Sequence, residues 1–529
     1  MIYVIGSGPS GMTAAQALLG AGRSVTMLDA GNELEPQRKR SVENLRLTDP
    51  PLWHGRNVAF LKNNVAPDAK GIGLKYLFGS DFPYRDVDRL AAITGHGADT
   101  TPSLAKGGFS NIWGASMLPY LQRDIGRWPI TIADLAPHYR AVLGAMDLSA
   151  RTDALSELFP LYTERAVPLR PSRQAAALLA DLEKHHARLS AAGIEFGSSR
   201  LAVRAESSPD GPGCVYCGLC MYGCPYDLIY NAAFSVARLS KHPNFTYIPN
   251  VIVQKLIETA AGARISAITK EGAALDDFLA ERVYLACGVI SSTQIILESL
   301  QAFDRPVTLS DSCYFLLPML RLRGTPGVGD EPLHTLAQAF VEIFNPDICD
   351  KTVHLQVYTY NDLYDGAFKK MLGPLYPLLR PALQPALGRL LILQGYLHSD
   401  LSPAVQVTLS RRVDGSRELR LEGQTMSDAT RSLLDRVGKL LRDHWFSFRA
   451  LPALPMLHVP LPGRGFHSGG TFPMSNSPRE FESDVLGRPT GFSRVHVVDS
   501  TTLPSIPATT ITLSVMANAH RIASRHDSI

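Results

Sequence analysis

Three glycines near the start of the chain are the first residues whose spacing points to chemistry. They form the pattern Gly-x-Gly-x-x-Gly between an apolar stretch at residues 2–5 and a helical pattern at residues 12–19. The first allows a tight turn, the second lets the backbone approach a pyrophosphate, and the third lets helix and strand pack closely. Asp29 ends the next apolar stretch, at the spacing of a carboxylate that binds ribose hydroxyls. The candidate dinucleotide-binding residues are Gly6, Gly8, Pro9, Ser10, Gly11, Asp29 and Ala30.

Four of the seven cysteines form a second candidate site. Between residues 214 and 225 they follow the pattern C-x₂-C-x₂-C-x₃-C-P, the spacing of bacterial ferredoxins. Thiolates on such a tight run can bind one iron–sulfur cluster, of the 4Fe–4S or 3Fe–4S type. Zinc competes, although structural zinc prefers two cysteine pairs that lie farther apart, and disulfides or purely structural packing are a further interpretation. The sequence favours iron–sulfur, with the ligands Cys214, Cys217, Cys220 and Cys224.

The elements that must position these residues recur along the chain. Residues 1–31 are typical of a strand, a glycine turn, a helix and a second strand. Residues 283–300 repeat the order strand, turn and helix, and the segment after residue 455 returns to it. This recurrence predicts an α/β fold in which distant parts of the chain build one nucleotide-binding unit around a second, inserted domain.

Size and composition narrow the class of protein. A chain of 529 residues exceeds one ordinary domain, and its 45% hydrophobic and 19% charged residues are typical of a soluble globular protein. The net charge of +3 gives no case for nucleic-acid binding. No secretory leader is expected at the first residues, and the scattered remaining cysteines suit a reducing compartment, so we expect a cytoplasmic protein. Export with a partner subunit that carries a signal is the alternative.

No uninterrupted apolar stretch is long enough to span a membrane, so no transmembrane segment is expected. The nearest candidate is residues 371–396, which are rich in leucine and alanine but broken by four prolines and two arginines. The favoured interpretation is a helical piece that covers a sheet, and peripheral membrane contact is the alternative.

Several separated segments resemble the glucose-methanol-choline (GMC) oxidoreductases, and the N-terminal glycine motif is the first of them. Residues 107–114 resemble the family's Gly-Gly-x-Ser stretch, which runs along the flavin, and residues 286–299 resemble its second signature. Residues 467–474 and 499–504 resemble its His-x-x-Gly-Thr-x-x-Met and Asp-x-Ser-x-x-Pro blocks. The resemblance implies FAD as cofactor. Further FAD contacts that it implies are Gly107, Ser110, Asn111, Trp113, Gly114, Val253, Gly288, Asp499 and Ser500.

The same resemblance implies the architecture. It is an α/β fold with a Rossmann-like FAD-binding domain of the p-hydroxybenzoate-hydroxylase type and an inserted α+β substrate domain built on an antiparallel sheet. The expected division is a discontinuous FAD-binding domain at 1–130, 195–305 and 456–529, which includes the cysteine run, a helical connection at 131–194 and a substrate-binding domain at 306–455.

The resemblance also implies the chemistry. In the family, the histidine at the position of His467 faces the flavin N5. An imidazole titrates near neutrality, so it can accept the hydroxyl proton while a hydride leaves the same carbon for the flavin. We therefore expect oxidation of a CH–OH group, with His467 as general base. The second His or Asn of the family falls on Thr510, whose hydroxyl can hydrogen-bond a substrate oxygen but cannot act as a base near pH 7.

Residues 128–139 and 224–231 resemble a branch of the family, the flavoprotein subunits of bacterial gluconate, fructose and glucose dehydrogenases. This implies a small alcohol or sugar as substrate. It also implies electron transfer through the iron–sulfur cluster to an external acceptor, a cytochrome or quinone-linked protein. Two alternatives stay open: an oxygen-using oxidase in which the cysteine run is structural, and a flavoprotein that has lost catalysis.

Overall fold

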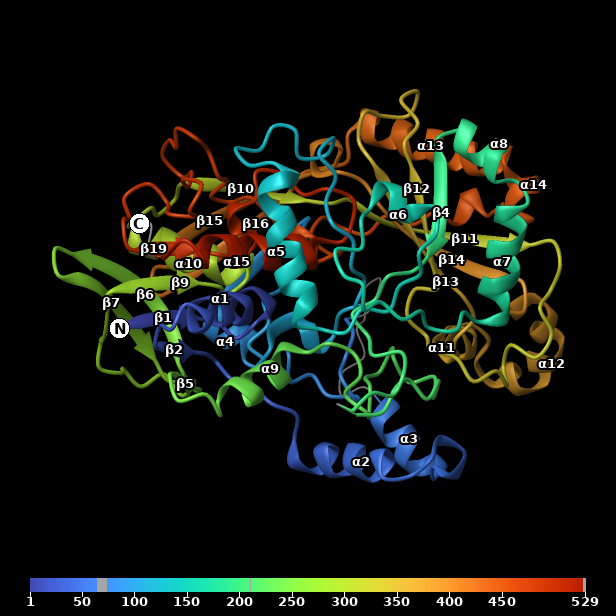
Figure 1. Cartoon of the computed structure of the whole chain (residues 1–529), viewed down its shortest axis with the longest axis horizontal. Coiled ribbons are helices and arrows are strands. Elements are labelled where there is room, and N and C mark those ends of the chain that lie inside the picture. The colour runs from blue at the N-terminus through green and yellow to red at the C-terminus, as the bar shows by residue number, and fades with distance from the viewer. Residues whose placement is uncertain (64–73, 210, 527–529) are drawn as a thin grey trace.

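The structure, a computed structural model, describes residues 1–63, 74–209 and 211–526. Both ends of the described chain lie on the same side of the molecule, next to a parallel sheet (Figure 1). A second, larger sheet lies on the opposite side, with helices packed against it. The mixed α/β class expected from the sequence is therefore confirmed.

The parallel sheet draws its strands from distant parts of the chain. Its order is β19-β9-β1-β2-β5, and all neighbours are parallel. Every residue of β1 and β2 is buried, as expected for a parallel sheet covered on both faces. The helix that follows β1 packs against the last helix of the chain, so the two ends fold together. The bounds are β1 Ile2–Ile5, β2 Val25–Leu28, β5 Phe245–Ile248, β9 Arg282–Leu285, β19 Val495–Val497, α1 Pro9–Gly20, α9 Ala232–Leu239, α10 Val289–Ser299 and α15 Ile511–Ala523.

The larger sheet has six antiparallel strands in the order β17-β11-β14-β13-β12-β4. One face packs its aliphatic side chains against helices α7, α8, α13 and α14 (right side of Figure 1). The bounds of its strands are β4 Ile194–Ser198, β11 Tyr314–Arg321, β12 Ala339–Ile343, β13 Val353–Tyr358, β14 Leu390–Tyr396 and β17 Ala450–Pro452. Those of its helices are α7 Arg173–Glu183, α8 His186–Ala191, α13 Asp428–Asp443 and α14 Trp445–Phe448.

The pairing register puts a row of polar and aromatic residues on the other face of this sheet. Tyr314 pairs with Tyr396, Tyr396 with His354, and His354 with Glu342. Side chains of paired residues point to the same side of a sheet, so four separate strands contribute to one row. This row lies next to the segment that carries His467.

Two further sheets complete the fold. A five-stranded sheet, β18-β10-β15-β16-β3, brings residues on either side of position 455 together, since β10 pairs with β18 of the C-terminal segment. The fourth sheet is the three-stranded antiparallel ribbon β6-β7-β8. The domain boundaries stay a prediction. The bounds are β3 Ile93–His96, β10 Pro306–Asp311, β15 Val405–Arg411, β16 Arg417–Gly423, β18 Ser468–Gly469, β6 Ile252–Thr259, β7 Gly262–Ile268 and β8 Phe278–Ala280.

The remaining helices lie mostly at the surface. Within the described residues, no helix is both long and apolar enough to cross a membrane. The helices are α2 Pro36–Arg46, α3 Gly55–Lys62, α4 Val87–Ala91, α5 Ile132–Gly144, α6 Leu155–Leu158, α11 Asp362–Leu372 and α12 Tyr376–Leu387, with short 3-10 turns that include η2 Gly108–Asn111 and η3 Gly373–Leu375.

Candidate active site

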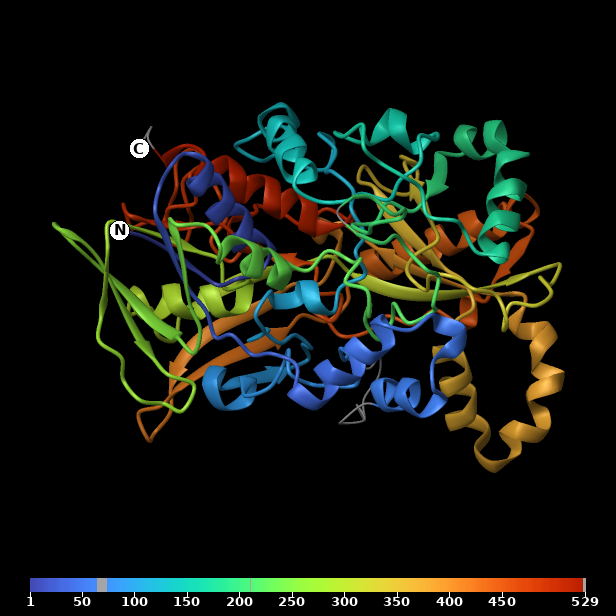
Figure 2. The ribbon, with the colours of Figure 1, turned by 60° about the horizontal axis from the view of Figure 1, so that its bottom comes forward.

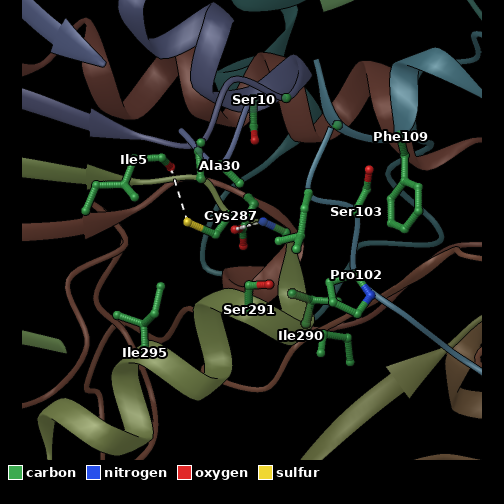
Figure 3. Close-up of a pocket in the computed structure, with 18 of the residues that line it drawn as sticks. Ile5, Ser10, Ala30, Pro102, Ser103, Phe109, Cys287, Ile290, Ser291 and Ile295 are labelled. Carbon is green, nitrogen blue, oxygen red and sulfur yellow. Dashed lines mark hydrogen bonds between the residues drawn. The ribbon is translucent and has the colours of Figure 1, made fainter. Parts of the chain in front are cut away.

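A cavity of about 250 Å³ lies where the parallel sheet meets the C-terminal segment. The glycine-rich turn before α1, the start of α10, and the segment with Pro102, Ser103 and Phe109 surround it (Figure 3). Most of the residues expected to bind the dinucleotide lie in its wall. They are Gly6, Gly8, Pro9, Ser10, Asp29, Ala30, Val253, Gly288, Asp499 and Ser500.

The glycines of the turn fill different roles. A Cβ at Gly6 would lie 2.5 Å from the Ala286 carbonyl oxygen, and one at Gly11 would lie 2.0 Å from the Gly6 carbonyl oxygen, so packing within the protein requires both. Gly8 is different, because no described atom lies within 4 Å of the Cβ that a side chain would add there. A glycine that borders open space is the arrangement expected where a backbone must approach a bound pyrophosphate. Gly11 lies behind this turn and not in the cavity wall.

Asp29 lies at the end of β2, as expected for the ribose-binding carboxylate. Its oxygens accept hydrogen bonds from the Ser7 backbone N–H at 3.1 Å, the Ser7 hydroxyl at 2.7 Å and the Tyr247 hydroxyl at 2.8 Å. Burial raises the pKa of this carboxyl, while the bonds from Ser7 and Tyr247 act against the shift. A carboxylate has about four acceptor sites, so Asp29 keeps capacity for one more hydroxyl donor.

Asp499 joins the C-terminal segment to the start of α10. Its carboxylate accepts from the Gly288 N–H at 2.9 Å, the Ser292 hydroxyl at 2.5 Å and the Thr501 N–H at 3.0 Å. Gly288 precedes α10 with a φ of +79°, a backbone conformation that residues other than glycine rarely adopt. The free N–H groups at this helix start border the cavity and suit phosphate or other anionic oxygens.

The predicted contacts at 107–114 lie just outside the cavity wall. The Gly107 N–H donates to the Ser7 hydroxyl at 2.8 Å, and the Ser110 hydroxyl accepts from Ala232 at 2.9 Å. The Asn111 amide donates to Gly108 at 2.7 Å, and the Trp113 indole donates to Tyr230 at 2.9 Å. These bonds tie η2 to the glycine turn and to α9, while Gly108 and Phe109 between them line the cavity. Contact of Gly107, Ser110, Asn111, Trp113 and Gly114 with FAD stays a prediction.

His467 is not itself in the cavity wall, but its neighbours along the chain, Phe466 and Ser468, both line the cavity. Its ring stacks on Tyr396 with centroids 4.5 Å apart and planes at 20°. The ring Nδ1 is buried and has no hydrogen-bond partner among the described residues. Burial, assisted by nearby His354, lowers the pKa of His467 to about 3, so the imidazole is neutral at pH 7 and a weaker base than a free imidazole.

Asp311 holds the segment that carries His467 in place by hydrogen bonds, and its role was not predicted from the sequence. One carboxylate oxygen accepts from the Gly463 N–H at 2.8 Å and the other from the Ser468 hydroxyl at 2.6 Å. The next residue, Ser312, donates its N–H to the His467 carbonyl at 3.0 Å. A carboxylate among apolar strands is a weak sequence signal, because the bonds that explain it come from residues far along the chain.

A buried histidine–glutamate pair lies beyond Tyr396, and sequence reasoning missed it as well. His354 Nδ1 lies 2.6 Å from a Glu342 carboxylate oxygen, and both side chains have no exposed surface. The His354 ring lies 6.1 Å from that of Tyr396. The sequence offered one signal for this pair, because two neighbouring apolar strands each contain an ionisable residue. Only the pairing register of β12 and β13 shows that the two residues lie opposite each other.

Thr510 does not line the cavity and is already engaged. Its hydroxyl oxygen accepts a hydrogen bond from the Leu118 backbone N–H at 2.7 Å, and both residues are buried. The geometry therefore gives Thr510 a structural bond, and a role in orienting the substrate stays a prediction.

The four clustered cysteines surround a separate small cavity of about 20 Å³. Such a volume has room for about one water molecule. Among the described residues, no three His, Cys, Asp or Glu side chains are placed to hold a metal ion. The predicted iron–sulfur ligands, Cys214, Cys217, Cys220 and Cys224, thus find no support in the described part of the structure.

Comparison with known proteins yields relatives that are oxidases. No protein-family model matches the chain. One curated protein, 6'''-hydroxyparomomycin C oxidase of Streptomyces lividus, is 25% identical over 308 residues, which are 56% of this chain and 50% of the relative. The match thus spans half the length of that curated protein.

Solved structures match over the whole chain. Pyridoxine 4-oxidase from Mesorbium loti superposes with a TM-score of 0.61 and 13% identity, covering 100% of this chain and 99% of the other. Formate oxidase superposes with a TM-score of 0.60 and 14% identity, covering 100% and 98%. A variant of the Aspergillus oryzae enzyme, described for its FAD modification, gives 0.59 and 15%, again covering 100% and 98%. At these identities the likeness establishes a shared fold.

Proposed function

We propose that the chain, which has the fold of the GMC oxidoreductases, is an FAD-dependent enzyme that oxidises a CH–OH group. One observation carries the proposal. The glycine turn, Asp29 and the start of α10 border a single cavity, and the two residues next to His467 along the chain line the same cavity. The oxidase names of the relatives, one of them described with FAD, support it.

The residues that would hold FAD follow from the cavity. Gly8 leaves the space for the pyrophosphate, Asp29 would bind ribose hydroxyls, and Gly288 begins the helix whose N–H groups face the cavity. When bound, the flavin supplies the acceptor for a hydride.

His467 would take the hydroxyl proton of the substrate. Its low pKa keeps the ring neutral, and Tyr396 holds the plane of the ring by stacking. A positioned base of this kind contributes about 10²–10⁴-fold in rate. Because Asp311 binds both Gly463 and Ser468, it keeps the backbone on either side of His467 in place. We further propose that the face of the larger sheet with Tyr314 and Tyr396 borders the substrate, an alcohol or sugar.

Dioxygen is the electron acceptor that we propose. The relatives are named oxidases, and the cysteine run gives no support for an electron relay. Stoichiometric hydrogen peroxide in aerobic turnover would support the oxidase. Slow reoxidation by oxygen, together with iron in the purified protein, would instead favour the dehydrogenase with an external acceptor protein.

The test of the function is anaerobic reduction of the flavin by a panel of alcohols and sugars, followed as loss of the yellow absorbance. In His467→Ala the rate of bleaching should fall by about 10²–10⁴-fold while FAD content is unchanged. His458→Ala is the matched control, because this exposed histidine lies nine residues earlier and its backbone bonds to Leu316 do not need its side chain. Equal bleaching rates in the two variants would refute the role of His467.

A further inference from the structure

A helical hairpin projects from the molecule beside the larger sheet. It consists of α11, η3 and α12, and Figure 2 shows it extending beyond the body of the protein. Its main contacts are within the hairpin itself. At its base, Tyr360, Tyr364 and Leu387 pack with Val328 and attach it to the body. The hairpin therefore stands out from the protein, whereas the sequence favoured a helical piece that covers a sheet.

The tip of the hairpin is apolar and exposed. Leu375 is 59% exposed, Leu378 78% and Leu379 37%. Their spacing of three and four residues brings them to one helical face. A single exposed leucine is ordinary, but a contiguous group on a projecting element marks an interaction site.

Exposed leucines continue at the base of the hairpin. Leu320 pairs with Leu390, the first residue of β14 after α12, and also with Leu451 of β17. Leu320 and Leu451 are each 46% exposed. The apolar surface is therefore not limited to the tip.

The charge of the segment indicates what covers this surface. Between residues 362 and 396 the sequence has four Lys or Arg residues and two Asp residues, Asp362 and Asp365, both in the first turn of α11 at the base of the hairpin. Asp362 pairs with Lys62 of the body, and the charged side chains in the tip and the rest of the hairpin are all positive. Lys369 is exposed near the end of α11 that leads into the tip, and Arg389 is exposed just after α12. An apolar tip next to an excess of cations is typical of helices that lie on anionic lipid, where leucines enter the acyl boundary and cations meet the phosphates.

We propose that the α11–α12 hairpin docks on an anionic phospholipid surface. Leu375, Leu378 and Leu379 enter the boundary between headgroups and acyl chains, at a depth of about 5–10 Å. The flanking Lys and Arg residues bind headgroup phosphates. Neither helix spans the bilayer, and the docking does not depend on the proposed oxidation, because His467 lies on a different element.

The test is flotation of the purified, FAD-loaded full-length protein with lipid vesicles. We expect it to float with vesicles of equal parts phosphatidylcholine and phosphatidylglycerol, far less with phosphatidylcholine alone, and less as salt is raised. The double variant Leu375→Glu and Leu378→Glu should lose about tenfold or more of the bound fraction. Leu279→Glu is the matched control, since Leu279 is 74% exposed on β8, whose sheet lies at the other end of the molecule (Figure 1).

Both variants must keep the FAD content and melting temperature of the unsubstituted protein, which shows that any loss is local to the surface. Failure of the unsubstituted protein to float with anionic vesicles would overturn the proposal. Equal losses in the hairpin variant and in Leu279→Glu would also overturn it. So would a change from dimer to monomer in the hairpin variant without any vesicle binding, because the leucines would then cover a second copy of the chain.

Discussion

Replacing Thr510 by valine separates a structural from a catalytic role at the position where the family has a second His or Asn. Valine keeps the shape of threonine and removes the hydroxyl, which accepts the Leu118 N–H at 2.7 Å. Leu118 is fully buried, so its N–H would lose its partner without gaining water. A buried donor left unsatisfied costs about 1–3 kcal/mol. We therefore expect Thr510→Val to lower the free energy of unfolding by that amount.

The adjacent Thr509 provides the control. Its hydroxyl is also buried but has no hydrogen-bond partner among the described residues. Thr509→Val removes a desolvated hydroxyl without breaking a bond, so it should leave stability unchanged or raise it.

Urea titrations of the unsubstituted protein, Thr510→Val and Thr509→Val, followed by intrinsic fluorescence, measure the differences in the free energy of unfolding. Anaerobic flavin bleaching then measures the chemical step, which should change by less than about threefold in Thr510→Val if the hydroxyl is structural. Unchanged stability together with a large loss of bleaching rate would refute the structural assignment. It would show instead that the Thr510 hydroxyl acts on the substrate.

Three further predictions concern the cavity and its surroundings. Gly8→Ala should keep the stability of the unliganded protein but bind FAD at least about tenfold more weakly. Gly11→Ala should instead destabilise the unliganded protein. Thermal melting with and without FAD separates weaker FAD binding from lower stability. Glu342→Gln should cost about 1–3 kcal/mol of stability in urea, since it disturbs the hydrogen bond to His354 between two side chains without exposed surface. An unchanged free energy of unfolding would refute a stabilising role of this contact. Burial raises the pKa of Asp311 to about 7, so the stability that the protonated carboxyl contributes is complete below about pH 4 and is lost as pH rises through 7. The free energy of unfolding, measured from pH 4 to 8, should therefore decline by up to about 1.4 kcal/mol per pH unit. In Asp311→Asn this decline should be smaller.

Local patterns were enough to predict the candidate dinucleotide-binding residues. Gly6 and Gly11 sit in a turn between consecutive elements, and Asp29 ends the next strand, so their relation depends on short stretches of chain. The cysteine run shows the limit of this reasoning. Its spacing is that of an iron–sulfur motif, but spacing does not settle how much space the four thiols enclose, which follows from the packing of the surrounding chain.

The sequence by itself determined the α/β class, the cofactor-binding turn and the candidate base, because strand and helix periodicity, glycine conformation and imidazole chemistry are local properties. Only the tertiary structure decided what surrounds His467. Tyr396, His354 and Glu342 come from three strands, and Asp311 from a fourth, and they meet through strand register and through the pairing of β10 with β18. Register depends on the packing of the whole sheet, so no single segment encodes it. The same holds for the leucines of the hairpin, whose exposure follows from the absence of a packing partner among the described residues.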